Sequence, residues 1–204
     1  MDTDKRAELL MEHYKDTFQL ILYHWKVRNR LFIYVLIILA LLGLDSYSPG
    51  SLSELVNAYI AKKIEKSPPL QLDIIGTAAW FILLSLVIQY YQRSIFVDRE
   101  YRYIQRLEEQ LCHEMGGDYV TREGKAYFSR TGRTDEGGKQ PMFIHAVGPV
   151  YVIVFPALLI VFTVWKVCFE WGCPKSFIQA LNTGIGIVII VFNILYVLWV
   201  IRRE

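Results

Sequence analysis

The sequence predicts an all-α integral membrane protein with four transmembrane helices, two helices extended into a cytoplasmic stalk, and a small β-hairpin. Three observations support this fold class. Apolar residues gather in long blocks, although 21% of the 204 residues are charged. Lys and Arg are distributed unevenly among the segments that join the blocks. Two blocks continue into helical apolar stripes with no glycine or proline between block and stripe.

The apolar blocks set the number of predicted spans. A helix needs about 20 predominantly apolar residues to cross the hydrocarbon core. Blocks two to four reach this length, and the first reaches it with its flanking residues. Their length argues against buried helices of a soluble protein. The blocks are Leu31–Leu44, Ile74–Tyr91, Met142–Trp165 (interrupted by Pro149 and Pro156) and Thr183–Ile201.

Charge excludes several classes of protein and predicts the orientation. The formal net charge is +2, too small for a basic nucleic-acid-binding surface, and the apolar content excludes disorder. Seventeen Lys and Arg residues fall on one side of the four spans and five on the other. The positive-inside rule therefore places both termini in the cytoplasm, which predicts a multi-pass protein of a bacterial inner membrane. The predicted organisation is a cytoplasmic helix 1–30, span 31–48, an extracytoplasmic loop with an amphipathic helix 49–73, span 74–92, a cytoplasmic helix and hairpin 93–141, span 142–166, an extracytoplasmic connection 167–181, span 182–201 and a cytoplasmic tail 202–204.

The first two spans are predicted to continue into the cytoplasm as helices. One continuous helix is expected from about residue 4 to the mid-forties, and a second from Ile74 to Met115, where Gly116 and Gly117 form the C-cap. Each projecting half carries an apolar stripe. The two stripes are expected to pack against each other or against adjacent subunits; the alternative, two solvated helices, would leave Phe18, Leu22, Ile104 and Leu111 in water.

Two smaller elements are predicted outside the bilayer. Residues 119–121 and 125–128 are strand-like, and Glu123-Gly124 can form the turn of a hairpin. A lone hairpin is only marginally stable, so it must lean on the stalk, another subunit or a partner. Residues 51–66 predict an amphipathic helix on the outer interface. Two interpretations of this helix remain open. Its apolar face packs over the helix bundle, or the helix senses disturbance of the cell envelope.

The cysteines and histidines predict no cofactor and no metal site. Cys168 and Cys173 either form a disulfide in an oxidising compartment or remain free thiols, whereas Cys112 is predicted to be reduced. The four histidines lack the spacing of metal ligands.

Polar residues within the blocks leave two interpretations open. Ser85, Gln89 and Asn193 can line a narrow hydrated pore formed by several subunits, or they can mediate helix–helix packing. The sequence predicts no ionisable residue within a membrane core, and Lys166, the last residue of the third predicted span, is counted with the outer connection. Transporters normally need such residues, so an intramembrane transporter or enzyme is disfavoured.

No catalytic pattern is present, and we predict that the chain is not an enzyme. Segment 92–141 carries nine bases and nine acids. This balance suits contacts with a protein better than contacts with lipid or nucleic acid. The candidate partner-binding residues are Arg106, Glu109, Arg122, Glu123, Lys125 and Tyr127.

Three stretches carry a resemblance to a known class: EHYKDTFQLILYHWKVRNRLFIYVLIILALLGL, YRYIQRLEEQL and REGKAYF. In its organisation the chain resembles small four-span membrane components of prokaryotic antiphage defence systems, such as the membrane subunits of Kiwa-type systems and the pore-forming effectors of nucleotide-signalled systems. The resemblance covers the whole chain as architecture and includes no diagnostic motif. It implies an oligomeric inner-membrane protein with a cytosolic defence partner.

Two functions follow as hypotheses. The first is a non-enzymatic, homo-oligomeric sensor or scaffold in the lipid bilayer that recruits a soluble cytosolic protein and binds no nucleic acid directly. The second is a channel or pore that permeabilises the membrane on activation.

Overall fold

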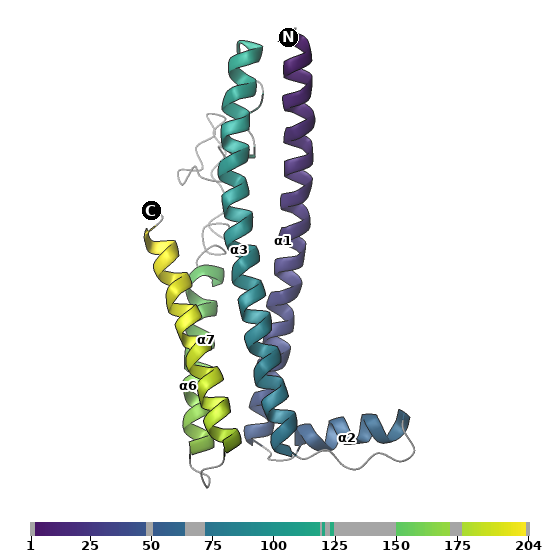
Figure 1. Ribbon diagram of the computed structural model, residues 1–204, viewed down its shortest axis with the longest axis vertical. Coiled ribbons are helices and arrows are strands. Elements are labelled where there is room, and N and C mark those ends of the chain that lie inside the picture. The colour runs from purple at the N-terminus through teal and green to yellow at the C-terminus, as the bar shows by residue number, and fades with distance from the viewer. Residues whose placement is uncertain are drawn as a thin grey trace. The chain divides into compact units, whose positions relative to one another are not determined.

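The computed structural model describes residues 3–47, 51–63, 72–118, 120, 123–124, 150–171 and 177–202. Every regular element in these ranges is a helix (Figure 1). The elements are α1 (Thr3–Tyr47), α2 (Ser51–Lys63), α3 (Leu72–Met115), the π-helix η1 (Val150–Val154), α6 (Phe155–Trp171) and α7 (Phe177–Arg202).

The two long predicted helices are confirmed. Helix α1 spans 45 residues and α3 spans 44. No proline interrupts either helix. Helix α3 ends at Gly116, whose φ of 69° is the left-handed conformation that favours glycine. The Gly117 N–H donates to the Cys112 carbonyl at 3.1 Å, the backbone bond of a Schellman cap. The predicted C-cap is therefore correct.

The chain divides into two compact units, which α1 and α3 both enter. The stalk unit comprises Met1–Arg30 and Tyr90–Ile144, and the apolar unit comprises Leu31–Gln89 and His145–Glu204. Each unit has its own buried residues and is described by itself below.

The stalk unit is built on an apolar seam between the two long helices. The N-terminal part of α1 lies beside the C-terminal part of α3 (Figure 1). Ile21, Val97 and Ile104 are buried in the seam, with Tyr14, Phe18 and Tyr101 packed against them. Burying such side chains is worth about 1.5–3 kcal/mol each. The predicted packing of the two stripes on each other is confirmed, although Leu22 remains 37% exposed.

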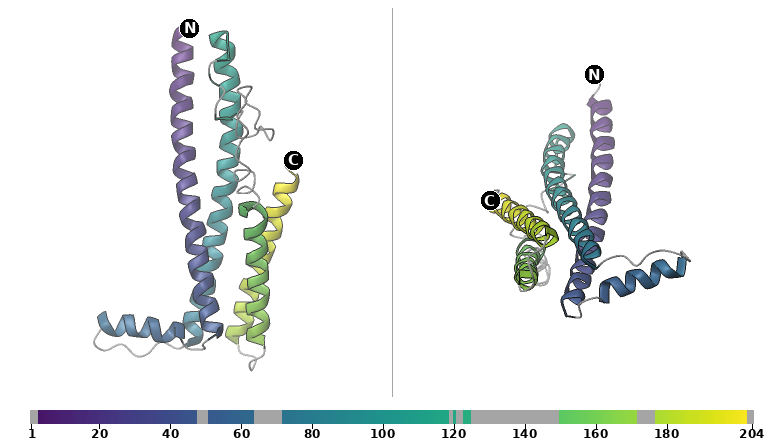
Figure 2. Two further views of the ribbon diagram at one scale, coloured as in Figure 1. Left: turned by 180° about the vertical axis from the view of Figure 1, so that it is seen from behind. Right: turned by 60° about the horizontal axis from the view of Figure 1, so that its bottom comes forward.

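The apolar unit contains the remaining helices. Helices α6 and α7 pack side by side (Figure 2). Gly186 permits the close approach, because a Cβ there would lie 3.0 Å from Val167 Cγ2 and 3.2 Å from Thr163 Cγ2. This contact fits the packing interpretation of the small and polar residues on these helices.

The predicted spans are supported in part. Within the described residues, three helices are long and apolar enough to cross a membrane: Lys5–Tyr47, Ile74–Met115 and Phe177–Arg202. The third predicted block is represented by the five-residue η1, which leads directly into the 17-residue α6. Residues 142–149 lie outside the described residues. The chain is thus an all-α protein with helices suited to a multi-pass membrane protein.

The two smaller predicted elements have different outcomes. Helix α2 begins at Ser51, as predicted, and exposes Leu55 and Tyr59; its location on a membrane surface stays a prediction. The β-hairpin is not supported. The structure has no strand in the part of the chain it describes, and most of the predicted hairpin (119, 121–122 and 125–128) lies outside that part. Glu123 does lie in a turn.

Candidate functional site

The structure brings two of the predicted partner-binding residues into one groove. Arg106 and Glu109 help to line an open groove of about 580 Å³ in the stalk unit. We call it the stalk groove. Arg122, Lys125 and Tyr127 lie outside the described residues, and Glu123 lies by Glu108 rather than in the groove. The lining residues are Arg6 from α1 and Arg106, Glu109, Gln110, His113 and Glu114 from α3.

An ion pair between the two helices forms one part of the groove lining. Arg6 Nη1 lies 3.2 Å from Glu114 Oε1, and their side chains are 60% and 15% exposed. Half-exposed pairs of this kind contribute about 0–1 kcal/mol. The pair therefore organises the groove more than it stabilises the stalk.

The other groove residues differ in how far they are already engaged. Glu109 Oε1 accepts a hydrogen bond of 3.4 Å from Gln105 Nε2. Arg106 donates Nε to the Arg102 carbonyl at 3.4 Å, and its guanidinium carbon lies 5.9 Å from the centre of the Tyr103 ring. Arg106 itself is an exposed residue of α3.

A buried carboxylate of the stalk unit holds the chain that follows α3. Glu108 is 0% exposed. Its Oε1 accepts the backbone N–H of Glu123 at 2.9 Å, the N–H of Gly124 at 2.8 Å and the hydroxyl of Tyr14 at 3.3 Å. Such bonds satisfy a charge that would otherwise be costly to bury. The turn at residues 123–124 is thereby tied to the stalk.

Only glycine fits at the contact point of this turn. A Cβ at Gly124 would lie 2.5 Å from the Gln105 Cα and 2.6 Å from its nitrogen. Both neighbours are backbone atoms and cannot rotate away. The absence of a side chain is what allows the Gly124 N–H to reach Glu108.

Glu108 is absent from the predicted site residues because it stands next to Glu109 in a segment rich in charged residues. A signal was present nonetheless. Glu108 follows Ile104 by four residues and precedes Leu111 by three, so it lies on the apolar stripe of α3. An ionisable residue on such a stripe indicates a buried partner.

Two other side chains of the stalk unit, His24 and Tyr101, have pKa values shifted from their usual ones. His24 is 8% exposed, and Arg93 Nη1 lies 3.0 Å from its Nδ1. Burial, and then the Arg93 charge, lower the pKa of His24 below 6.5, which favours a neutral ring that accepts from Arg93. Burial and the nearby Glu123 raise the pKa of the Tyr101 hydroxyl, against an opposing effect of Arg28.

The three predicted pore-lining residues do not share a surface within the apolar unit. Ser85 and Gln89 are exposed on α3, and Gln89 Nε2 donates to Ser85 Oγ at 3.1 Å. Asn193 is 0% exposed on α7, and its Nδ2 donates to the Ile189 carbonyl at 2.7 Å. Asn193 therefore serves the interior of a single copy.

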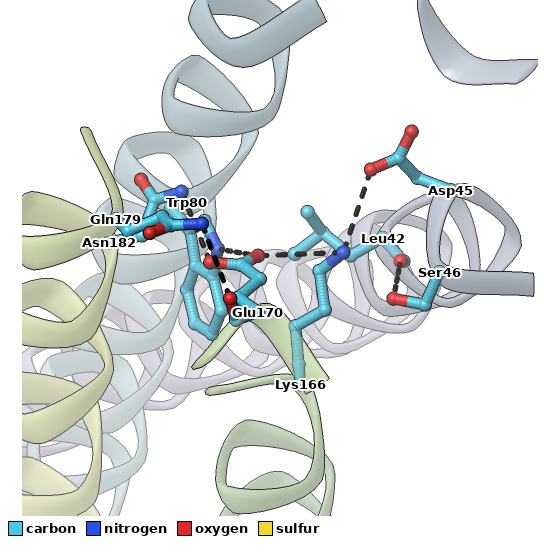
Figure 3. A network of polar contacts seen from close by, with 8 residues as sticks. All are labelled: Leu42, Asp45, Ser46, Trp80, Lys166, Glu170, Gln179 and Asn182. Carbon is cyan, nitrogen blue, oxygen red and sulfur yellow. Dashed lines mark hydrogen bonds and ion pairs between the residues drawn. The ribbon is translucent and has the colours of Figure 1, made fainter. Parts of the chain in front are cut away.

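The apolar unit also buries an ionic network that the sequence analysis did not predict (Figure 3). Lys166 was placed in an outer connection, but it lies within α6 and is 3% exposed. Its Nζ lies 3.5 Å from Asp45 Oδ2 and 3.5 Å from Glu170 Oε1. A transporter or intramembrane enzyme was disfavoured because no buried ionisable residue was predicted among the apolar blocks. That premise does not hold for this cluster.

Neutral donors complete the network around Glu170. Trp80 Nε1 donates to Glu170 Oε1 at 3.3 Å, and Asn182 Nδ2 donates to Oε2 at 3.3 Å. Gln179 donates to the Glu170 carbonyl. The network joins four helices, because Asp45 comes from α1, Trp80 from α3, Lys166 and Glu170 from α6, and Gln179 and Asn182 from α7. The i,i+4 spacing of Lys166 and Glu170 was its only local signal.

The cysteines lie apart from these sites. Cys112 donates its thiol to the Val120 carbonyl at 3.3 Å. Cys168 is an exposed residue of α6. Cys173 lies outside the described residues, so the disulfide stays a prediction. Among the described residues, no group of three or more His, Cys, Asp and Glu side chains could hold a metal ion.

Comparison of the chain with protein-family models, curated proteins and solved structures gave no match.

Proposed function

We propose that the chain is a non-enzymatic, oligomeric inner-membrane scaffold or sensor that recruits a soluble cytosolic protein. The observation that carries this proposal is the stalk unit. Its helices continue beyond the apolar stretches of α1 and α3, bury their own seam and present a charged groove. A membrane anchor alone needs no ordered structure of this kind.

The membrane arrangement belongs to the proposal. We infer four spans, with η1 and α6 together supplying the third. The five residues of η1 and the 17 of α6 form one uninterrupted helical run, about as long as a bilayer core requires. Both termini and the stalk face the cytoplasm, because Lys and Arg are concentrated in those segments.

Self-association and the cellular role are further parts of the proposal. Ser85 and Gln89 form a polar pair exposed on an otherwise apolar stretch of α3, which a neighbouring copy would shield from lipid. A role in antiphage defence follows from the resemblance to four-span defence components.

A native mass determination tests the scaffold proposal. The tagged chain is solubilised gently from its own host, and the masses of the released complexes are measured. We expect a second, soluble protein in fixed ratio to several copies of the chain. Complexes that contain only copies of the chain would contradict recruitment.

A pore that permeabilises the membrane is the second candidate, and the exposed Ser85–Gln89 pair favours it. In this case Gln89→Leu should abolish ion flux through reconstituted oligomers without dissociating them. The matched control is Ile82→Leu, an exposed apolar position on the same helix. Full flux in Gln89→Leu would remove this pair from the pore wall.

A further inference from the structure

The polar side chains that line the stalk groove differ in whether they already have hydrogen-bond or ion-pair partners within the stalk. Its two carboxylates already have partners within the stalk: Glu114 pairs with Arg6, and Glu109 accepts from Gln105. Arg106 uses only Nε, on a backbone carbonyl. Gln110 and His113 are exposed and have no polar contact with another described residue.

The unengaged groups lie on one face of α3. Arg106, Gln110 and His113 are separated by steps of four and three residues, which align side chains along a helix. All three can donate hydrogen bonds, and Arg106 carries a permanent positive charge. The groove therefore offers a row of donors beside two carboxylates: Glu114 is paired with the charge of Arg6, whereas Glu109 accepts only from the neutral amide of Gln105.

We propose that the stalk groove binds an acidic peptide segment of a soluble protein, with Arg106, Gln110 and His113 contacting its carboxylates. This inference rests on the proposed scaffold function and specifies the chemistry of the partner. A volume of about 580 Å³ accommodates a few side chains rather than a whole helix. Arginine recognises carboxylates through paired N–H donors, which gives direction as well as charge.

The position of the groove along α3 favours a protein ligand over a lipid headgroup. Arg106 follows Tyr91, the last residue of the apolar block, by 15 residues of continuous helix. That is about 22 Å at 1.5 Å per residue. The Debye length at physiological ionic strength is about 8 Å, so attraction to an anionic bilayer surface is screened over this distance.

Fluorescence anisotropy with defined peptides tests the inference. The full chain is placed in nanodiscs of zwitterionic phosphatidylcholine, and the probes are fluorescein-labelled peptides of alternating Glu and Ala, or of Gln and Ala. We expect the Glu peptide to bind at least about tenfold more tightly than the Gln peptide. One charge-assisted hydrogen bond is enough for a difference of this size.

Variants of exposed residues locate the binding. Arg106→Gln should weaken binding of the Glu peptide about tenfold, whereas Glu109→Gln should strengthen it by removing a competing carboxylate. Arg99→Gln is the matched control, because Arg99 is exposed on the same helix but does not line the groove. Equal affinity for the two peptides, or equal losses in Arg99→Gln and Arg106→Gln, would overturn the inference.

Failure of this inference is distinguishable from failure of the scaffold function. If a soluble protein co-purifies in the same ratio with the wild type and with Arg106→Gln, the scaffold stands and the groove is not its docking site. The opposite result is that no soluble protein co-purifies but the Glu peptide still binds in an Arg106-dependent manner. In that case the preference of the groove for acidic peptides stands, and recruitment of a partner in the host does not.

Discussion

The stalk unit and the apolar unit each bury a charged side chain, and they stabilise it in different ways. Glu108 accepts two backbone N–H groups at 2.8 and 2.9 Å. Lys166 relies on two carboxylates, each 3.5 Å away. Backbone donors are fixed by the chain path, whereas side-chain partners can rotate. The stalk therefore holds its charge through local geometry, and the apolar unit holds its charge through the packing of several helices.

Removing the cation of the apolar unit should have the largest effect on stability. Lys166→Met leaves the carboxylates of Asp45 and Glu170 without a counter-charge, and only Glu170 keeps neutral donors, from Trp80 and Asn182. We expect a loss of about 3–5 kcal/mol in the free energy of unfolding, measured by denaturation in detergent micelles.

The matching rescue tests whether uncompensated charge is the cause. Adding Asp45→Asn and Glu170→Gln to Lys166→Met replaces the ions with neutral groups of similar size. Most of the lost stability should return, because exchanging a whole buried ionic cluster is often neutral. A triple variant no more stable than the single one would mean that Lys166 acts through packing.

Removing the carboxylate of the stalk should have the next largest effect. Glu108→Ala leaves the N–H groups of Glu123 and Gly124 without their acceptor, at a cost of about 1–3 kcal/mol for each buried unsatisfied group. Hydrogen exchange of these two amides should accelerate. Glu109→Ala is the control, because Glu109 is the next residue of the same helix and is exposed. Similar exchange in both variants would contradict the assigned contact.

A methyl group at the turn should have a smaller effect of the same kind. Gly124→Ala forces the turn away from the Gln105 backbone, and such overpacking costs about 1–3 kcal/mol. Gly76→Ala provides the control, because nothing lies within 4 Å of the added Cβ. Limited proteolysis after residue 118 should be faster in Gly124→Ala alone. Unchanged proteolysis would show that the turn tolerates a side chain.

The smallest expected effect is a pH dependence of the stalk. The pKa of His24 is lower in the folded protein than its usual 6.5 because of burial and Arg93. The unfolded chain therefore binds more protons between these two pKa values, and stability falls as the pH drops through this window. His24→Gln should flatten this part of the thermal stability profile. The same slope in wild type and variant would assign it to another group.

Predictions that depend on residues close together in the sequence were confirmed more often than predictions that depend on contacts between distant residues. Periodicity and helix breakers predicted α1, α3, the seam of Ile21 and Ile104, and the cap at Gly116, because each depends on residues within a few turns of one helix. The hairpin rested on weak local propensity, and the structure does not support it. The stalk groove was anticipated through Arg106 and Glu109, although its other lining residues were not.

The spacing of apolar residues and the helix-breaking residues were enough to predict where the long helices run and end, since both act locally along the chain. Which of two adjacent glutamates is buried depends on tertiary contacts, because Glu108 meets a turn 15 residues away and Glu109 does not. The burial of Lys166 depends on them too. Asp45 stands 121 residues before Lys166 in the chain, and no local pattern records that the packing of the helices brings their charges together.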